Sequence, residues 1–273
     1  MIKLSFPATQ DFWEIAVLYE DEHLLALNKP SGLLTSPDRN EPERPSLLSL
    51  LHAGIGENKP WARARRLAYL MNAHRLDAET SGVLLFARSK LVLVSLANWF
   101  GSEQPGKKYV ALAQGEAAEE RFEVEAKLAP HPFTAGLVRV DARGKHARTL
   151  FTVRERFAGW TLLTCEPIAL RPHQFEAHLQ HIRLPLVGAR PYGGRLLLLS
   201  RLKRAYRLKP NQTERPLLSR PALHAEELTL PHPVTGQPLV INAPWPRDLT
   251  VAVKYLRRYA AVGAKPADSD GPD

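Results

Sequence analysis

The fold and the candidate site of this chain both depend on one stretch, HRLDAETSGVLLFA, which spans residues 74–87. Arg75 and Asp77 stand in its polar half, and a strongly apolar run follows from residue 83. A polar loop that leads directly into a buried strand can hold a carboxylate rigidly, and Thr80-Ser81-Gly82 supplies hydroxyls and a permissive backbone for a tight turn. The stretch therefore predicts a buried strand, with Asp77 as a candidate reactive residue just before it.

On the residues alone, two interpretations of Asp77 remain open. A single aspartate beside Thr, Ser and Gly is usually a turn or capping carboxylate. Arg75 and the apolar strand favour a functional carboxylate instead, because a charge at the boundary of a core needs partners.

The composition favours a globular protein with a polyanionic partner. The 273 residues suffice for one sizeable domain or two lobes, and 37 Lys and Arg against 28 Asp and Glu give a net charge of +9. This charge favours RNA or an anionic membrane surface. No apolar run could span a bilayer and residues 1–4 do not open a signal peptide, so we expect a soluble, cytoplasmic protein. The single Cys165 excludes an internal disulfide and is expected as a small buried strand residue rather than a catalytic thiol.

Periodicity along the chain predicts an α+β fold. Strands are expected at residues 14–19, 23–28, 109–113, 150–153, 224–230 and 239–242, and helices at 90–100 and 246–260. The last two strands form a hairpin around the turn at residues 231–236. Runs of strands with helices packed beside them are typical of an α+β domain.

The stretch at residues 74–87 resembles the catalytic signature of the RluA-type pseudouridine synthases, which reads His-Arg-Leu-Asp, two variable residues, Thr-Ser-Gly and an apolar strand. Further blocks match that family in the same order: YEDEHLLALNKPSGL (19–33), KKYVAL (107–112), PLVG with PYG (185–193), and ALHA with HPVTG (222–236). The resemblance implies a mixed, largely antiparallel sheet with flanking helices and a central RNA-binding cleft, in a single catalytic domain over residues 1–263. Because the matches begin near Leu18, we expect no separate N-terminal RNA-binding domain of the S4 type.

The activity that this resemblance implies is conversion of uridine in ribosomal or transfer RNA to its carbon-linked isomer, with no cofactor and no metal. Asp77 matches the family's nucleophile, and Tyr109 matches its active-site tyrosine, a rigid aromatic that stacks on the uracil. Arg75 would occupy the space of the extruded base or hold a phosphate. Further RNA contacts are expected from His74, Lys107 and Lys108. Neither a membrane nor an obligate protein partner is indicated.

The segment LRPHQFEAH at residues 170–178 departs from the family pattern, Gly-Arg-Thr-His-Gln-Ile-Arg-Val-His. Glu176 stands where the family has the arginine that pairs with the catalytic aspartate. Two carboxylates in one site would disfavour ionisation of one of them, and loss of a buried partner costs about 3–5 kcal/mol. Three alternatives remain open: Arg171 or Arg183 supplies the counter-charge, Glu176 turns outward, or the chain is a catalytically silent RNA-binding relative. A retaining glycosidase with Asp77 and Glu176 as paired carboxylates fits acid/base logic but not the ordered blocks.

Three histidines on the same segment, His173, His178 and His181, suggest a metal site. No Asp or Cys lies at ligand spacing, so we expect histidines on a polar or RNA-facing side of a helix.

Residues 195–220 form a basic insertion, in which Lys203, Arg204 and Arg207 are expected to contact phosphates. The tail at residues 264–273 is rich in Pro, Asp, Gly and Ala and is expected to be disordered.

Overall fold

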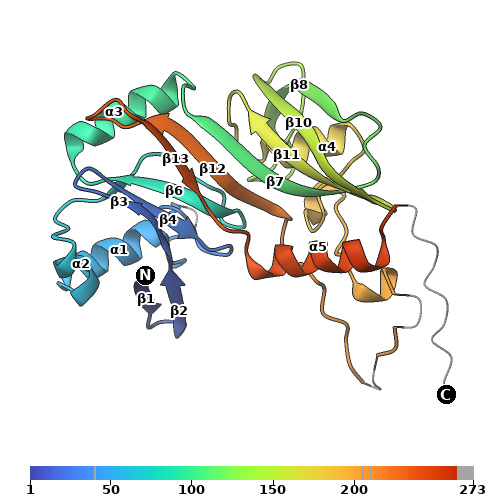
Figure 1. Ribbon diagram of the computed structural model, residues 1–273, viewed down its shortest axis with the longest axis horizontal. Coiled ribbons are helices and arrows are strands. Elements are labelled where there is room, and N and C mark those ends of the chain that lie inside the picture. Colours follow the sequence, from blue (N-terminus) through green and yellow to red (C-terminus); the bar gives the residue numbers. More distant parts are fainter. Residues whose placement is uncertain (40, 204–205, 209–210, 263–273) are drawn as a thin grey trace. The chain divides into compact units, whose positions relative to one another are not determined.

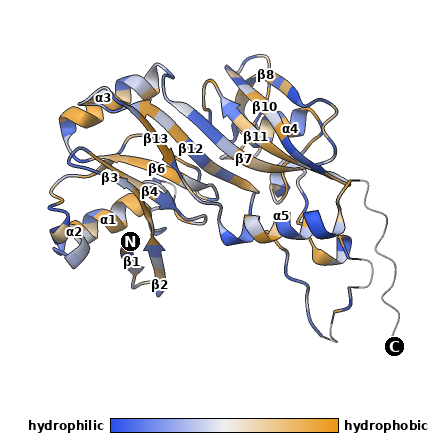
Figure 2. Cartoon of the chain, in the orientation of Figure 1, coloured by the Kyte–Doolittle hydropathy of each residue, from blue (hydrophilic) through white to orange (hydrophobic). Residues whose placement is uncertain are grey.

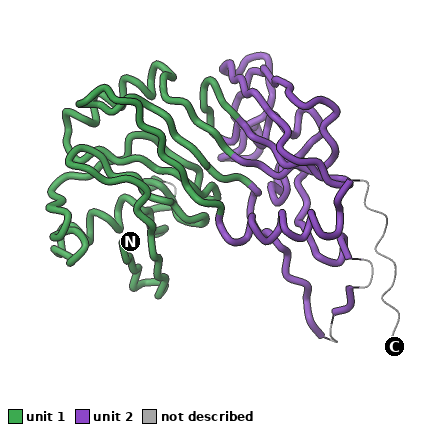
Figure 3. The backbone as a smooth tube through the Cα atoms, in the orientation of Figure 1, with its two compact units in different colours: residues 1–109, 166–172, 223–245 green, residues 110–165, 173–222, 246–273 purple. Residues whose placement is uncertain are grey.

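The computed structural model describes residues 1–273 except 40, 204–205, 209–210 and 263–273. The chain forms two compact units that interleave in the sequence (Figure 3). Unit 1 consists of residues 1–109, 166–172 and 223–245, and unit 2 of residues 110–165, 173–222 and 246–273. Two strands contribute residues to both units, namely β7 (Gly106–Gln114) and β11 (Trp160–Pro167).

Unit 1 is built on a mixed sheet whose neighbouring strands follow the order β3-β4-β6-β12-β7. These strands are β3 (Val17–Glu20), β4 (Leu24–Lys29), β6 (Ser81–Ala87), β12 (Leu223–Pro231) and the start of β7, with β5 (Met71–Asn72) beside β6 and β13 (Pro238–Asn242) beside β12. β4 is antiparallel to β6, with Lys29 opposite Gly82, and β6 is parallel to β12, with Gly82 opposite Ala225. A separate antiparallel pair is formed by β1 (Ile2–Phe6) and β2 (Asp11–Ile15).

The core of unit 1 lies between this sheet and helix α3 (Lys90–Gly101), which runs along one face of the sheet (Figure 1). All seven residues of β6 are buried, as the apolar run predicts, and the strand is hydrophobic along most of its length (Figure 2). Leu85 of β6 packs in one cluster with Leu96 of α3 and Leu228 of β12. Helices α1 (Leu47–Gly56) and α2 (Pro60–Ala64) complete this unit.

Unit 2 continues from β7 in the strand order β7-β11-β10-β8-β9. Its other strands are β8 (Arg121–Pro130), β9 (Val138–Val140) and β10 (Lys145–Phe157). β8 is antiparallel to both β10 and β9. Helix α4 (Gln174–His181) packs on β8, β9 and β10, and α5 (Arg247–Tyr259) is the last helix of the described chain. Of the helices that the structure describes, none combines the length and the apolar character that a membrane crossing requires.

The structure confirms the predicted fold class, a mixed α+β fold with a mostly antiparallel sheet. The expected helices are α3 and α5, the expected hairpin is β12 with β13, and Cys165 is buried in β11. The prediction of one strand over residues 14–19 is wrong in one respect. β2 ends at Ile15 and β3 begins at Val17, because β2 pairs with β1 whereas β3 pairs with β4.

Gly82 is required by the close approach of β6 and β12. Its φ angle is +121°, and a Cβ atom at this position would lie 2.1 Å from the carbonyl oxygen of Ala225. An alanine would be strained in this conformation and would collide with backbone that cannot move cheaply. We therefore expect Gly82→Ala to lower the free energy of unfolding by at least about 2 kcal/mol.

Urea denaturation measures this loss, and Gly101→Ala is the matched control. Gly101 ends α3, has no positive φ, and would place its Cβ in open space. A stability of Gly82→Ala equal to that of Gly101→Ala would contradict the close approach.

Candidate functional site

Asp77 lies in the loop of residues 73–80, which connects β5 to β6, and its side chain is exposed. The amide of Thr80 donates a hydrogen bond to the carbonyl oxygen of Asp77 at 3.0 Å, which closes a turn over residues 77–80. The predicted turn before a buried strand is therefore present. It begins earlier than Thr80-Ser81-Gly82, because Ser81 and Gly82 already belong to β6.

A fully buried lysine, Lys29, holds this loop in place. Its Nζ atom donates hydrogen bonds to the carbonyl oxygens of Pro30, Leu33 and Ala78 at 2.9, 2.6 and 2.9 Å. Ala78 also accepts a hydrogen bond from the amide of Gly32 at 2.9 Å. A buried ammonium needs several acceptors to offset its lost hydration, so the segments that supply them are held together.

A second contact fixes the residue on the other side of Asp77. The hydroxyl group of buried Thr35 donates to the carbonyl oxygen of Leu76 at 2.7 Å and accepts from the amide of Leu76 at 3.1 Å. The residues before and after Asp77 are thus both tied to the segment 29–35, while the carboxylate itself faces solvent. A carboxylate on a fixed backbone is what a nucleophile requires.

His74 packs at the start of the same loop. Its Nε2 atom accepts a hydrogen bond from the amide of Leu85 at 3.2 Å, and its ring stacks on Phe100 with 4.9 Å between centroids. Burial, reinforced by the charge of Lys107, lowers the pKa of His74 to about 3. A neutral, packed imidazole is suited to positioning the loop rather than to holding a phosphate.

Tyr109 of β7 is buried, and it interacts electrostatically with Asp77. Burial, and then the charge of the Asp77 carboxylate, raise the pKa of Tyr109 well above its usual value. The phenol is therefore protonated at neutral pH, where it can donate a hydrogen bond but cannot take up a proton. The structure thus brings together the two residues that the sequence predicts to be catalytic.

The cations expected to contact RNA differ in their surroundings. Arg75 is exposed. Lys107 is half-buried with its Nζ atom 5.2 Å from the centroid of the Phe100 ring, and burial lowers its pKa. Lys108 forms an ion pair with Glu227 at 2.8 Å, which offsets part of its charge. Arg75 is therefore the best suited of the three to hold a phosphate.

The structure excludes one of the alternatives for Glu176. This residue lies in the first turn of α4 in unit 2, and only 4% of it is exposed, so the alternative in which it turns outward to solvent is excluded. Arg171 is half-buried in unit 1, after the end of β11, whereas Arg183 is exposed. Of these two arginines, Arg171 shares its unit with Asp77.

The expectation of polar-face histidines is wrong for His178, which is fully buried. Its Nδ1 atom lies 3.1 Å from the Thr149 hydroxyl, and burial, with the charge of His181, lowers its pKa to about 4. The reason is that α4 is a short helix packed on three strands, so that all residues from 174 to 179 are buried and not one stripe alone. Among the described residues, no group of three or more His, Cys, Asp or Glu is placed to hold a metal ion.

The basic insertion at residues 195–220 is closed at its base by a bridge between Leu197 and Leu218. Inside it, the amide of Ser200 donates to Glu214 Oε1 at 2.8 Å. The side chains of Lys203 and Arg207 are exposed. Arg204 and the expected disordered tail at 264–273 lie outside the described residues.

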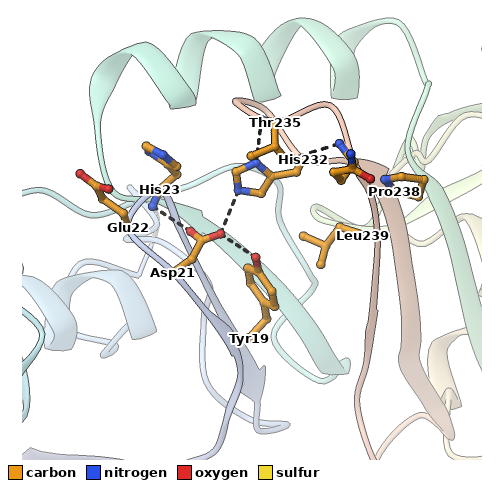
Figure 4. Close-up of a pocket in the computed structure, with 9 residues that line it drawn as sticks. Tyr19, Asp21, Glu22, His23, His232, Thr235, Pro238 and Leu239 are labelled. Atoms are coloured by element: carbon orange, nitrogen blue, oxygen red, sulfur yellow. Dashed lines mark hydrogen bonds and ion pairs between the residues drawn. The ribbon is translucent and has the colours of Figure 1, made fainter.

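A further polar network in unit 1 was not predicted from the sequence. One oxygen of Asp21 accepts from the Tyr19 hydroxyl at 2.6 Å and lies 2.9 Å from His232 Nε2, and the other accepts from the amide of His23 (Figure 4). That second oxygen also accepts from the amide of Leu24. The hydrogen bond to Asp21, followed by burial, raises the pKa of Tyr19 to about 12. Although these residues line a cavity of about 230 Å³, the Asp21 carboxylate already has four contacts. Its role is to tie the β3–β4 turn to the β12–β13 turn.

Comparison with known proteins places the chain in a family. A family model described as RNA pseudouridylate synthase matches residues 23–181. Ribosomal large subunit pseudouridine synthase D of Xylella fastidiosa is 35% identical over 256 residues, which cover 90% of this chain and 70% of that protein. Ribosomal large subunit pseudouridine synthase C of Escherichia coli K12 is 35% identical over 245 residues, which cover 88% and 70%.

A solved structure agrees with these matches at the level of the fold. The structure of human RNA pseudouridylate synthase domain containing 4 has a TM-score of 0.66 at 22% identity, and the match covers 89% of this chain and 93% of that chain. The chain therefore belongs to the RNA pseudouridylate synthase family and is an enzyme of that class, as the resemblance at residues 74–87 predicts.

Lys29 and Thr35 are site residues that sequence reasoning missed, because the carbonyl groups of Ala78 and Leu76 that they bind are distant in the chain. The available signal is a lysine that ends the strand Leu24–Lys29, whose first four residues are apolar. We expect Lys29→Met to lower the free energy of unfolding by roughly 2 kcal/mol or more, since the carbonyl oxygens of Pro30, Leu33 and Ala78 lose a donor and a buried unsatisfied group costs about 1–3 kcal/mol.

Urea denaturation again provides the measurement, and Lys90→Met is the control because Lys90 is exposed at the start of α3. Equal stabilities of the two variants would show that the ammonium of Lys29 does not hold the loop.

Proposed function

We propose that the chain isomerises uridine to pseudouridine in ribosomal or transfer RNA of the cytoplasm, with Asp77 as the nucleophile. The observation that carries the proposal is the exposed Asp77 carboxylate on a loop fixed by Lys29 and Thr35, coupled to the Tyr109 phenol. The names of the two bacterial relatives, both ribosomal large subunit pseudouridine synthases, favour ribosomal RNA as the substrate.

The isomerisation breaks the bond between ribose C1′ and uracil N1 and forms a bond between C1′ and C5. C5 loses its proton and N1 takes up a proton, so that substrate and product have the same composition. In the proposal the Asp77 carboxylate acts as a nucleophile on the target uridine as the C1′–N1 bond breaks. The released uracil then rotates beside the rigid aromatic ring of Tyr109. Because the raised pKa keeps the phenol protonated, Tyr109 donates a hydrogen bond in this sequence and is not the base that removes the C5 proton.

RNA binding is assigned to exposed cations. Arg75, two residues before Asp77, occupies the space of the extruded base or holds a flanking phosphate. Lys203 and Arg207 of the basic insertion, together with Arg204, contribute sequence-independent phosphate contacts. His74 supports the loop from inside the unit.

In this proposal Arg171 supplies the positive charge that the family obtains from an arginine at the position of Glu176. It is half-buried, belongs to the same unit as Asp77, and always carries a charge. The buried Glu176 is the observation that favours the second candidate function, a catalytically silent RNA-binding relative.

The first test concerns the nucleophile. Asp77→Asn should abolish pseudouridine formation and leave RNA affinity within about tenfold of wild type, since one carboxylate contributes little to phosphate binding. Carbodiimide-based mapping of pseudouridine on RNA from a deletion strain carrying each variant measures the activity.

The matched control is Glu79→Gln, which removes a carboxylate from the same loop two residues away. It should retain activity. Full modification by Asp77→Asn would remove Asp77 from the mechanism.

A second test separates the sources of counter-charge. Arg171→Ala should lower the single-turnover rate by about 100-fold, which corresponds to about 3 kcal/mol of lost pairing, whereas Arg183→Ala should have little effect. Glu176→Arg should leave activity equal or lower, because a second cation would crowd Arg171. The assay follows release of tritium from RNA labelled at uridine C5.

Robust turnover in Arg171→Ala would rule out this role of Arg171. Absence of turnover in wild type, with activity gained in Glu176→Arg, would instead identify a silent relative whose only defect is the missing arginine. Thermal melts of each variant confirm that it is folded.

A further inference from the structure

Helix α5 of unit 2 is amphipathic, with hydrophilic and hydrophobic residues alternating along it (Figure 2). Its apolar residues Leu249, Ala252, Val253 and Leu256 are buried in the protein. This face is therefore already occupied, and only the opposite face is available to a partner.

The available face carries three cations, which we call the α5 stripe: Arg247, Lys254 and Arg258, all exposed. At about 100° of rotation per residue, these three positions lie within about 40° of one another around the helix axis. At about 1.5 Å of rise per residue, they extend over roughly 16 Å along it. The three charges thus form one narrow line rather than a scattered set.

The α5 stripe has no ion-pair partner within the residues that the structure describes. In contrast, the neighbouring Arg257, which projects about 80° from Arg247, pairs with Glu155 at 2.9 Å. Tyrosines flank the stripe, with Tyr255 stacked on Tyr259 at 6.0 Å and the Arg258 guanidinium 5.4 Å from the Tyr259 ring centroid. Like charges aligned in this way repel one another, so an anionic partner would be stabilising.

The arrangement favours a nucleic-acid backbone over a membrane surface. A basic amphipathic helix binds a membrane by inserting its apolar face, and the apolar face of α5 is buried. Duplex DNA carries one negative charge per about 1.7 Å of helix axis, and we use this spacing for an RNA duplex. A stripe of roughly 16 Å would therefore face more phosphates than it has cations.

The helix is also fixed to the base of the basic insertion. Buried Arg220 forms a bidentate ion pair with Asp248 in the first turn of α5, with N···O distances of 2.8 and 3.0 Å. The two basic elements of unit 2 are therefore connected by a rigid contact.

We propose that the α5 stripe binds the phosphate backbone of a helical part of the RNA, outside the nucleotide that is modified. This inference rests on the proposed function, because it takes RNA to be the anionic partner of the stripe. The stripe is a positioning surface: it sets affinity, and it takes no part in the chemical step.

The test compares two triple variants of equal charge. Arg247→Gln with Lys254→Gln and Arg258→Gln removes the stripe, whereas Arg143→Gln with Arg148→Gln and Arg257→Gln removes three exposed cations of unit 2 that are held in ion pairs. The probe is a fluorescent 20-base-pair RNA duplex, titrated by anisotropy between 50 and 200 mM salt.

We expect the stripe variant to bind the duplex about tenfold or more weakly at 100 mM salt, with the slope of log K against log salt reduced by about two to three. The control triple should change the slope by less than about one. In the single-turnover assay the stripe variant should require more RNA for half-maximal rate and reach the wild-type rate at saturation.

Equal affinities of the two triple variants would overturn the proposal, as would loss of binding to vesicles containing phosphatidylglycerol with unchanged binding to the duplex. The result is separable from the catalytic proposal. If wild type formed no pseudouridine but the stripe variant lost duplex binding, the stripe would stand and the proposed function would fail.

Discussion

The buried ammonium group of Lys29 is the constraint on which the candidate site depends. Lys29 ends β4 and lies opposite Gly82 of β6. Its Nζ atom donates a hydrogen bond to the carbonyl oxygen of Ala78, the residue that follows Asp77. A charge in this environment is tolerated only if it is surrounded by acceptors, so the loop must close around it. Gly82 allows β12 to approach at the same point, and the exposed carboxylate is thereby set on a framework of three strands.

Asp77 and Tyr109 differ in solvent exposure, and this difference fits their proposed roles. Tyr109 is buried and stays neutral, whereas Asp77 is exposed in the folded protein. RNA that covered Asp77 would exclude solvent from the carboxylate and add the negative charge of its phosphates. A bound RNA would therefore increase the need for a counter-charge beside Asp77, which is the role that the proposed function gives to Arg171.

The sequence predicts the elements whose pattern is local and fails where tertiary contacts decide. The apolar run after Asp77, the spacing of residues 90–100 and the hairpin after His224 each predict an observed element. The roles of Lys29, Thr35 and Asp21 could not be found in this way, because each depends on one partner, Ala78, Leu76 or His232, that lies 41 or more residues away in the chain. His178 was misjudged because helical periodicity identifies one buried face, whereas packing on three strands buries more than one.

Native-state amide hydrogen exchange at Leu76 and Thr80 tests most directly whether the nucleophile is held by the buried framework. The amide of Leu76 donates to the Thr35 hydroxyl outside the loop, and the amide of Thr80 donates to the carbonyl of Asp77 within it. A rigid loop predicts exchange as slow as that of the β6 amides in wild type, and much faster exchange when Lys29 is replaced by methionine. Rapid exchange at both positions in wild type, with the strand amides still protected, would contradict the claim that Lys29 and Thr35 fix Asp77.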